Sequence, residues 1–392
     1  MRWLTVPLGD VAEVAAGGGA PQDQADFGSE GYPFVRAGSL KVLIAGGATA
    51  TLERLAPAIA TKHKLRLFPA NTVLFAKSGM SASIGLVHRL QWPAYVVNHL
   101  AAVMCGEQLE SAFLHHYLRA FSPSRLIQDA AYPSIRLGDI AGMKIPLPPV
   151  QEQRRIAAIL DQAETLRAKR REALALLRSL RQSIFIEMFG DPVQNVKGYP
   201  TKPLSALVEP ERGITYGIVQ RGEDCDDGVP VLRIRDLVSD EIELRCLKRT
   251  SASISAQYRR TILRGGEIAI SIRGTIGRCG IVPQSLAGGN VSREIALIPV
   301  LKDISADFVL EFLRSTAVQR IIAEDVKGVA QSGINLEDLR RVAVPLPGQV
   351  EMAAFVSRVA AAHRLIGLEI KAVVSQDELF ASLQHRAFRG EL

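Results

Sequence analysis

Apolar residues recur at helical spacing over about 40 residues in the middle of the chain. Ile156, Leu177 and Ile184 fall on a seven-residue step, and Arg170 interrupts that register. An apolar stripe with a seven-residue repeat is typical of a helix that packs against another helix. The pattern stops at Gly190, so we predict one long helix over residues 149–190.

A second stripe with the same step occupies the end of the chain, over residues 348–392. Either helix alone would leave its stripe in water, so we predict that the two pack as an antiparallel coiled coil. The alternative is that each stripe packs onto its own domain. The residues that we assign to the helix pair or to partner docking are Ile156, Leu166, Leu177, Ile184, Val359, Ile366, Val373 and Phe380.

Short runs rich in β-branched and aromatic residues precede each long helix. Gly, Pro or Asn bounds these runs, which is typical of strands. The predicted strands are Tyr32–Leu40, Asn71–Ala76, Tyr95–Met104, Val229–Ile234, Glu267–Ile272 and Glu294–Val300. Helical patterns such as Ser111–Phe121 are interspersed without regular alternation, so the fold class is predicted to be α+β, with a twisted sheet in each domain.

The chain contains a long internal repeat. Ile145-Pro146-Leu147-Pro148 returns as Val344-Pro345-Leu346-Pro347, an offset of 199 residues (345 − 146 = 199). Each copy is followed by a predicted long helix, so the repeated unit is a domain plus a helix. We therefore expect a pseudo-twofold arrangement of four parts, with domains at 1–148 and 191–347 and helices at 149–190 and 348–392.

Composition limits the class of protein. The chain has 392 residues, of which 47% are apolar and 22% charged, as expected of a globular protein with several domains. The net charge of +7 is compatible with a polyanionic partner, although such an excess can also serve solubility. No apolar run approaches the roughly 18 residues of a membrane span, so we expect a cytoplasmic protein without membrane contact.

Motifs for catalysis and metal binding are missing from the sequence. There is no phosphate-binding loop, zinc-protease motif, nucleophile elbow or dinucleotide-binding glycine motif. The four cysteines are scattered, with no C-x-x-C pair, so no metal site is expected. We predict no catalytic residue and no cofactor in this chain. An unrecognised nuclease or methyltransferase, and an adaptor that binds only protein, remain alternatives.

Candidate DNA contacts recur at matching places in the two domains. The segment 75–79 aligns with 270–274, and each combines hydroxyl or basic side chains with a glycine. Hydroxyls and arginine suit phosphate oxygens, and glycine lets backbone N–H groups come close to them. Strand arginines also serve as surface or ion-pair residues, which is the alternative here. The predicted DNA-binding residues are Arg36, Lys77, Ser78, Ser81, Tyr216, Arg233, Arg235, Ser271, Arg273, Thr275 and Arg278.

The sequence resembles the specificity subunits of type I restriction-modification systems over nearly its whole length. The segment from Pro146 to Asp161 is similar to the family's P-L-P-P-x-x-E-Q-x-x-I-x-x-x-L-D motif at the start of the central helix. Arg273-Gly274-Thr275-Ile276-Gly277 is similar to the S-R-G-T-I-G segment of its target recognition domains. The second helix start departs from the pattern, with Gly348 and Val350-Glu351-Met352 where the family favours proline and Glu-Gln.

The resemblance implies a DNA reader without catalytic activity of its own. Each target recognition domain would read one half of a split site on double-stranded DNA. The paired helices would set the spacer and dock two modification (methyltransferase) subunits, which use S-adenosylmethionine. Restriction subunits, with ATP and Mg, would add translocation and cleavage.

Overall fold

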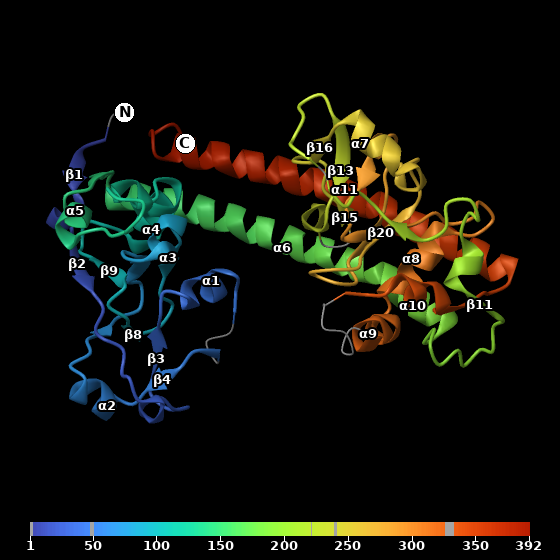
Figure 1. Cartoon of the computed structure of the whole chain (residues 1–392). Helices are drawn as coiled ribbons and strands as arrows, with labels where there is room; N and C mark the ends of the chain where they lie inside the picture. Colours follow the sequence, from blue (N-terminus) through green and yellow to red (C-terminus); the bar gives the residue numbers. More distant parts are fainter. Residues whose placement is uncertain (1–2, 48–50, 221, 239–240, 326–332) are drawn as a thin grey trace. The chain divides into compact units, whose positions relative to one another are not determined.

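The computed structural model describes residues 3–47, 51–220, 222–238, 241–325 and 333–392. The chain divides into two compact units (Figure 1). The first comprises Met1–Arg170 with Ala372–Leu392, and the second comprises Arg171–Lys371. Each unit therefore contains a globular domain together with part of each of the two long helices.

The described residues of the first unit form three sheets. Its strands are β1 (Thr5–Pro7), β2 (Ala12–Ala16), β3 (Tyr32–Val35), β4 (Arg54–Leu55), β5 (Leu67–Phe68), β6 (Val73–Ala76), β7 (Val87–Arg89), β8 (Ala94–Val96), β9 (Leu100–Cys105) and β10 (Lys144–Pro146). The central sheet has the order β2-β9-β6-β7, a second has the order β4-β3-β8-β5, and β1 pairs with β10. Its helices are α1 (Ser39–Ile44), α2 (Pro57–Lys62), α3 (Met80–Ile84), α4 (Ser111–Ala120), α5 (Leu137–Ala141) and the first part of α6 (Val150–Phe189).

The second unit repeats this topology. Its strands are β11 (Thr201–Pro203), β12 (Thr215–Tyr216), β13 (Val229–Leu232), β14 (Leu237–Val238), β15 (Glu241–Ile242), β16 (Lys248–Thr250), β17 (Ile268–Ser271), β18 (Cys279–Ile281), β19 (Asn290–Val291), β20 (Ile295–Ile298) and β21 (Ala343–Pro345). The orders β12-β20-β17-β18 and β11-β21 match those of the first unit. The sheet β16-β13-β19 corresponds to β4-β3-β8 without a counterpart of β5 in the described residues, and β14 pairs with β15. Its helices are α7 (Ala252–Gln257), α8 (Ala306–Arg314), α9 (Thr316–Asp325), α10 (Leu336–Arg341) and part of α11 (Gln349–Ala387).

The predicted strands are shorter in the structure or interrupted. The prediction Tyr32–Leu40 was wrong after Val35, because Ser39 and Leu40 belong to helix α1. The prediction Tyr95–Met104 is interrupted by a turn, in which the Leu100 N–H donates to the Val97 carbonyl at 3.0 Å. The prediction Val229–Ile234 ends at Leu232 because the Asp236 carboxylate accepts from the backbone N–H of Arg233, at 2.9 Å, and starts a 3₁₀ turn. Arg233 and Arg235 therefore lie in a turn, and the prediction that they lie in a strand was wrong.

The core of each unit includes side chains from both long helices. In the first unit, Ile156 of α6 and Phe380 of α11 belong to one buried cluster, in which Phe113 of α4 and Phe388 have ring centroids 5.5 Å apart. In the second, Phe185 of α6 and Phe355 of α11 have centroids 5.9 Å apart and join the buried cluster of that unit. Burying one such aromatic side chain stabilises the fold by about 1.5–3 kcal/mol.

The long helices pair antiparallel, as predicted, with an α+β domain preceding each (Figure 1). Within the first unit, Arg155 donates to the Leu392 carbonyl and Arg167 to Asp377. Within the second, Arg181 contacts His363 and Glu187 pairs with Arg358. In both units the partner's number falls as the number along α6 rises, so the helices run in opposite directions.

Most of the assigned stripe is buried, and Ile156, Ile184, Val359 and Phe380 join the core clusters of the two units. Among its members, Ile156, Ile184, Val359, Ile366 and Phe380 are buried, and Leu177 and Val373 are half-buried. Leu166 differs, with 51% of its surface exposed. The neighbouring Arg167, whose side chain is 16% exposed, faces α11 in its place. Leu166 therefore lies outside the helix pair, and its assignment to partner docking stays a prediction.

Candidate nucleic-acid interface

In the first domain, several predicted segments leave the same edge of the central sheet. β2 and β6 both pair antiparallel with β9, so their carboxyl ends lie at one edge. The register shows this directly, because Ala16 and Phe75 both pair with Ala101. The chain that follows β2, including Gly17, therefore emerges beside the chain that follows β6, including Lys77.

Backbone hydrogen bonds bring two further segments to this edge. Gly18 donates to the Val96 carbonyl at 2.9 Å, and Val97 donates to Val35 at 3.0 Å. Lys77 donates to the His99 carbonyl at 2.9 Å. Arg36, which directly follows Val35, consequently lies at the same edge. We call residues 17–19, 36, 77–81 and 97–99 the loop edge of the first domain.

The second domain builds an equivalent edge with equivalent bonds. Ile218 donates to Val291 at 2.8 Å, Ser292 to Leu232 at 2.9 Å, and Ile272 to Glu294 at 2.8 Å. Residues 217–219, 233–235, 272–278 and 292–294 form its loop edge, and Tyr216 lies directly before it. The structure thus assembles most of the predicted DNA-binding residues into one edge per domain, although they are far apart in sequence.

Glycine is required where the chain leaves β2 and β12. A Cβ atom on Gly17 would lie 2.1 Å from the Val96 carbonyl oxygen. A Cβ atom on Gly217 would lie 1.8 Å from the Val291 carbonyl oxygen. Such separations are far below van der Waals contact, so any side chain here would push the chain that follows β2 or β12 away from the neighbouring strand. The two glycines fix the close approach that forms each loop edge.

The predicted glycine segments adopt the same local conformation. Gly79 has φ +74° and Gly274 has φ +68°, in the left-handed region that glycine adopts without strain. The residue before each glycine forms an antiparallel bridge, Ser78 with Ser134 and Arg273 with Gly333. The sequence alignment of these segments therefore corresponds to a shared backbone geometry.

Some predicted residues present their side chains to solvent. Arg273 and Thr275 are exposed, and the Arg273 guanidinium has no ion-pair partner within the described ranges. The Arg235 side chain is 68% exposed. Arg278 is exposed and donates to the Leu237 carbonyl at 3.2 Å. Guanidinium groups placed this way suit phosphate oxygens or the O6/N7 edge of guanine.

Other predicted residues are engaged within the fold. Ser271 is fully buried, and its hydroxyl donates to the Thr275 carbonyl at 2.6 Å and accepts from the Arg278 N–H at 2.9 Å. Its hydroxyl thereby closes the loop 271–278. Arg233 donates to Asp236 through Nε at 3.2 Å, and so has less freedom to contact DNA.

In the first domain, Arg36 also has internal partners. It donates to Glu53 at 2.7 Å, and its Cζ lies 5.1 Å from the centre of the Phe27 ring. Ser78 shares a hydrogen bond of 2.8 Å with His99, while Lys77 and Ser81 are half-buried. These assignments stay predictions. The internal bonds favour a positioning role for Arg36 and Ser78.

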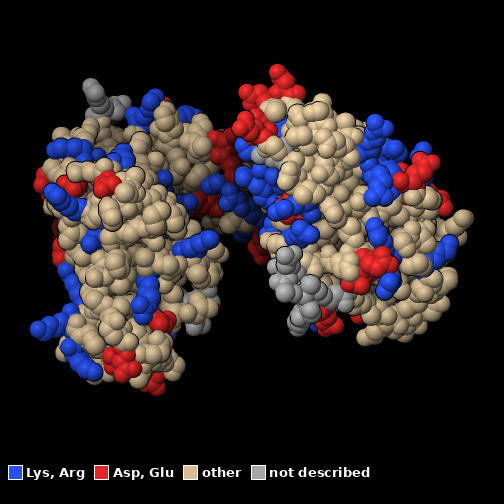
Figure 2. All heavy atoms as spheres, in the orientation of Figure 1, with Lys and Arg blue, Asp and Glu red and all other residues tan. Residues whose placement is uncertain are grey.

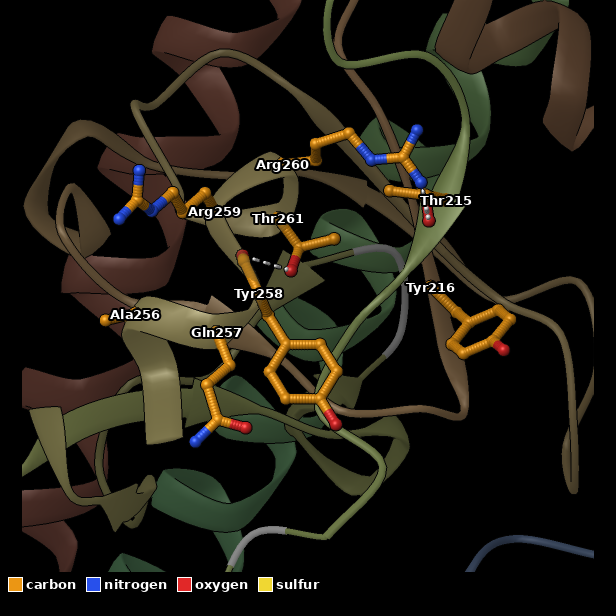
Figure 3. Close-up of a pocket in the computed structure, with 8 residues that line it drawn as sticks. All are labelled: Thr215, Tyr216, Ala256, Gln257, Tyr258, Arg259, Arg260 and Thr261. Atoms are coloured by element: carbon orange, nitrogen blue, oxygen red, sulfur yellow. Dashed lines mark hydrogen bonds between the residues drawn. The ribbon is translucent and has the colours of Figure 1, made fainter. Parts of the chain in front are cut away.

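A cavity beside the loop edge of the second domain contains residues that sequence reasoning missed. It has a volume of about 640 Å³ and is lined by Thr215, Tyr216, Ala256, Gln257, Tyr258, Arg259, Arg260 and Thr261. Figure 3 shows the Arg260 guanidinium directed toward Thr215, to which it donates at 3.5 Å. Two tyrosines and two arginines can stack on bases and bind phosphate. The run Tyr258-Arg259-Arg260 is a basic and aromatic signal in the sequence that could have found this cavity.

Surface charge in the second unit agrees with a polyanionic ligand. Figure 2 shows clusters of Lys and Arg side chains on its visible face, with acidic side chains beside some of them. Among the described residues, no three His, Cys, Asp or Glu side chains gather closely enough to hold a metal ion. The helices in the described ranges also include none that is long and apolar enough to cross a membrane.

Comparisons with known proteins identify related chains. The family model of the type I restriction modification DNA specificity domain matches residues 2–175 and 217–376. The type I restriction enzyme EcoBI specificity subunit of Escherichia coli is 26% identical, over 100% of this chain and 86% of that protein. The EcoKI specificity subunit of Escherichia coli strain K12 is 23% identical, over 100% of this chain and 89% of that protein.

A solved structure has the same fold. The crystal structure of the type I restriction-modification system S subunit from M. genitalium aligns with a TM-score of 0.57 at 15% sequence identity. The alignment covers 99% of this chain and 96% of that chain.

Proposed function

This chain belongs to the family of specificity subunits of type I restriction-modification systems, and from that premise we propose that it reads a split DNA site, with one domain for each half. The observation that carries the proposal is the repeated loop edge. Each domain has its own edge, built by equivalent hydrogen bonds but with different side chains. Two different readers of similar construction suit a target with two unlike halves.

The side chains of the loop edges support a division of labour. Exposed arginines such as Arg273 and Arg235 would bind backbone phosphates and supply most of the affinity. Side chains that differ between the copies would distinguish bases. Lys77 and Arg273, for example, lie close to equivalent glycines, and a lysine and an arginine differ in their hydrogen-bonding geometry.

The long helices are proposed to set the spacer between half-sites and to dock two modification subunits. In support of this, α6 and α11 each contribute to the cores of both units. Methylation with S-adenosylmethionine, and restriction with ATP and Mg, would belong to partner subunits. Inserting seven residues in each helix preserves the heptad and adds about 10 Å of helix. The spacer between the two halves of the methylated motif should then lengthen by about three base pairs. An unchanged spacer would contradict the proposal that the helices set its length.

DNA binding by the assembled complex tests the proposal. Fluorescence anisotropy across a series of salt concentrations should give salt-sensitive binding, which Arg273→Ala weakens. Arg364→Ala, on an exposed position of α11, serves as the control. Equal affinity of the Arg273→Ala variant and the wild type would count against the loop edge as the DNA-binding surface.

Two other classes of protein make different predictions. An unrecognised nuclease or methyltransferase would show turnover when the purified chain alone is incubated with DNA, Mg and S-adenosylmethionine. A pure protein adaptor would assemble with partners but show no salt-sensitive DNA binding in the assembled complex.

A further inference from the structure

A second cavity in the second unit is enriched in arginine. It has a volume of about 480 Å³ and lies among α6, α8, α9 and the loop 271–278. The charged side chains that line it are Arg178, Arg181, Arg278, Arg314 and Glu311. Four guanidinium groups and one carboxylate give the lining a formal charge of +3 (4 − 1 = 3).

The carboxylate is already shared by two of the arginines. Glu311 accepts from Arg314 at 3.0 Å and lies 3.6 Å from Arg181. All three side chains are more than nine-tenths buried. Arg314 also donates to the Cys279 carbonyl at 3.0 Å, which fixes it in the wall. A positive charge held in so buried a wall attracts an anion more strongly than it would in open water.

The equivalent arginine of the first domain pairs with a different element. Arg119 occupies the same place in α4 that Arg314 occupies in α8, and it pairs with Glu164 of α6 at 2.5 Å. The position 199 residues after Glu164 (363 − 164 = 199) is His363. His363 lies 2.6 Å from Arg181 through one ring nitrogen and 3.7 Å from Asp307 through the other. An imidazole therefore stands in the second domain where the first domain has the Glu164 carboxylate.

The cavity is continuous with the loop edge of the second domain. One loop, 271–278, carries the exposed Arg273 near its start and Arg278 in the cavity lining at its end. Ser271 holds the two ends of this loop together by accepting from the Arg278 N–H. A ligand that contacts Arg273 can thus extend along the loop to the cavity.

We propose that this cavity binds a phosphate group of the DNA backbone, next to the half-site read by the second domain. The inference rests on the proposed function, because it assigns one more contact to the same DNA. Guanidinium forks match phosphate oxygens in geometry and in charge. The contact positions the DNA on the protein without selecting bases.

The test uses Arg178→Gln, because Arg178 lines the cavity but is not part of the loop edge. DNA affinity of the assembled complex is measured by anisotropy at several salt concentrations, with cognate and unrelated duplexes. Arg178→Gln should weaken both duplexes to the same degree and reduce the salt slope by about one. Arg178→Lys, which keeps the charge, should restore the wild-type slope, and Arg364→Gln on α11 controls for loss of a distant positive charge.

Each contrary result has a distinct meaning. A wild-type slope in Arg178→Gln, together with weakened binding in Arg273→Ala, would overturn the cavity proposal and leave the proposed function standing. Absence of salt-sensitive binding by the wild-type complex would overturn both. Thermal protection by inorganic phosphate that Arg178→Gln abolishes, with no change in salt slope, would assign the cavity to a free anion. Loss of assembly with the modification subunit would assign it to a partner's carboxylate. Either of these last two results would overturn the DNA contact.

Discussion

The guanidinium of Arg167 lies over the ring of Phe380, with 4.2 Å between its Cζ atom and the ring centroid. Its Nε also donates to Asp377 at 2.7 Å, so one arginine of α6 contacts two successive turns of α11. The contact places a charged side chain at a position where a simple coiled coil has an apolar one. It explains why Leu166, one residue earlier, is turned toward solvent.

Replacing Arg167 by alanine should destabilise the first unit by about 1–3 kcal/mol, because it removes a cation–π contact and leaves Asp377 without that guanidinium. Urea unfolding followed by circular dichroism measures the change. Arg154→Ala is the matched control, since the Arg154 side chain is 68% exposed and its ion pair with Glu110 should contribute less than about 1 kcal/mol. Equal destabilisation by the two substitutions would contradict this account of the helix pair.

Gly217→Ala should damage the second loop edge, because the added methyl group would collide with the Val291 carbonyl. Binding to DNA that carries both half-sites should weaken, and sequence discrimination should be lost at one half-site. Gly17→Ala should affect the other half-site. Gly138→Ala is the control, because Gly138 lies in α5 outside both loop edges and no atom lies within 4 Å of its Cβ position. The measurement is competition binding with duplexes altered in either half-site, and loss of both halves from Gly217→Ala alone would contradict independent reading.

The sequence predicts the architecture better than the details of the site. The repeat around Pro146 and Pro345 predicted two similar domains, each followed by a long helix, because a seven-residue stripe and a duplicated motif are local features. The cavity at Tyr258 and Arg260 was missed, because it depends on a 3₁₀ turn packing beside an edge strand. The internal hydrogen bonds of Ser271 could not be predicted from the sequence either, because only the folded loop shows where its hydroxyl points.

Asp236→Asn should disturb the turn that positions Arg233. The buried carboxylate accepts from the Arg233 backbone and from its guanidinium, and an amide cannot accept as strongly from a cation. We expect a loss of about 1–3 kcal/mol in stability of the second unit. We also expect weaker binding to the half-site of that domain. Unchanged unfolding and unchanged DNA affinity would show that the turn does not depend on this carboxylate.

His115 should make the first unit sensitive to acid. Burial, followed by the neighbouring His116 and Arg119, lowers the pKa of His115 from 6.5 to about 3. In this range the unfolded chain binds a proton that the folded chain does not. Stability therefore falls as the pH drops from 6.5 toward 3, by at most about 1.4 kcal/mol per pH unit, and is unaffected above 6.5.

Substituting His115 by glutamine should flatten this part of the pH profile. Urea midpoints measured between pH 7 and pH 4 (about 3 units) provide the test, and His385→Gln, at an exposed position of α11, is the control. If His115→Gln and the wild type lose stability in parallel over that interval, another group is responsible for the acid sensitivity.

The split reading of DNA is tested most directly by mapping methylated bases. Cells that express the chain together with its modification subunit are sequenced by a method that detects methylated adenine. We predict one motif made of two short defined sequences separated by a spacer of fixed length and undefined sequence. A single uninterrupted motif, or methylation that does not depend on this chain, would contradict the account.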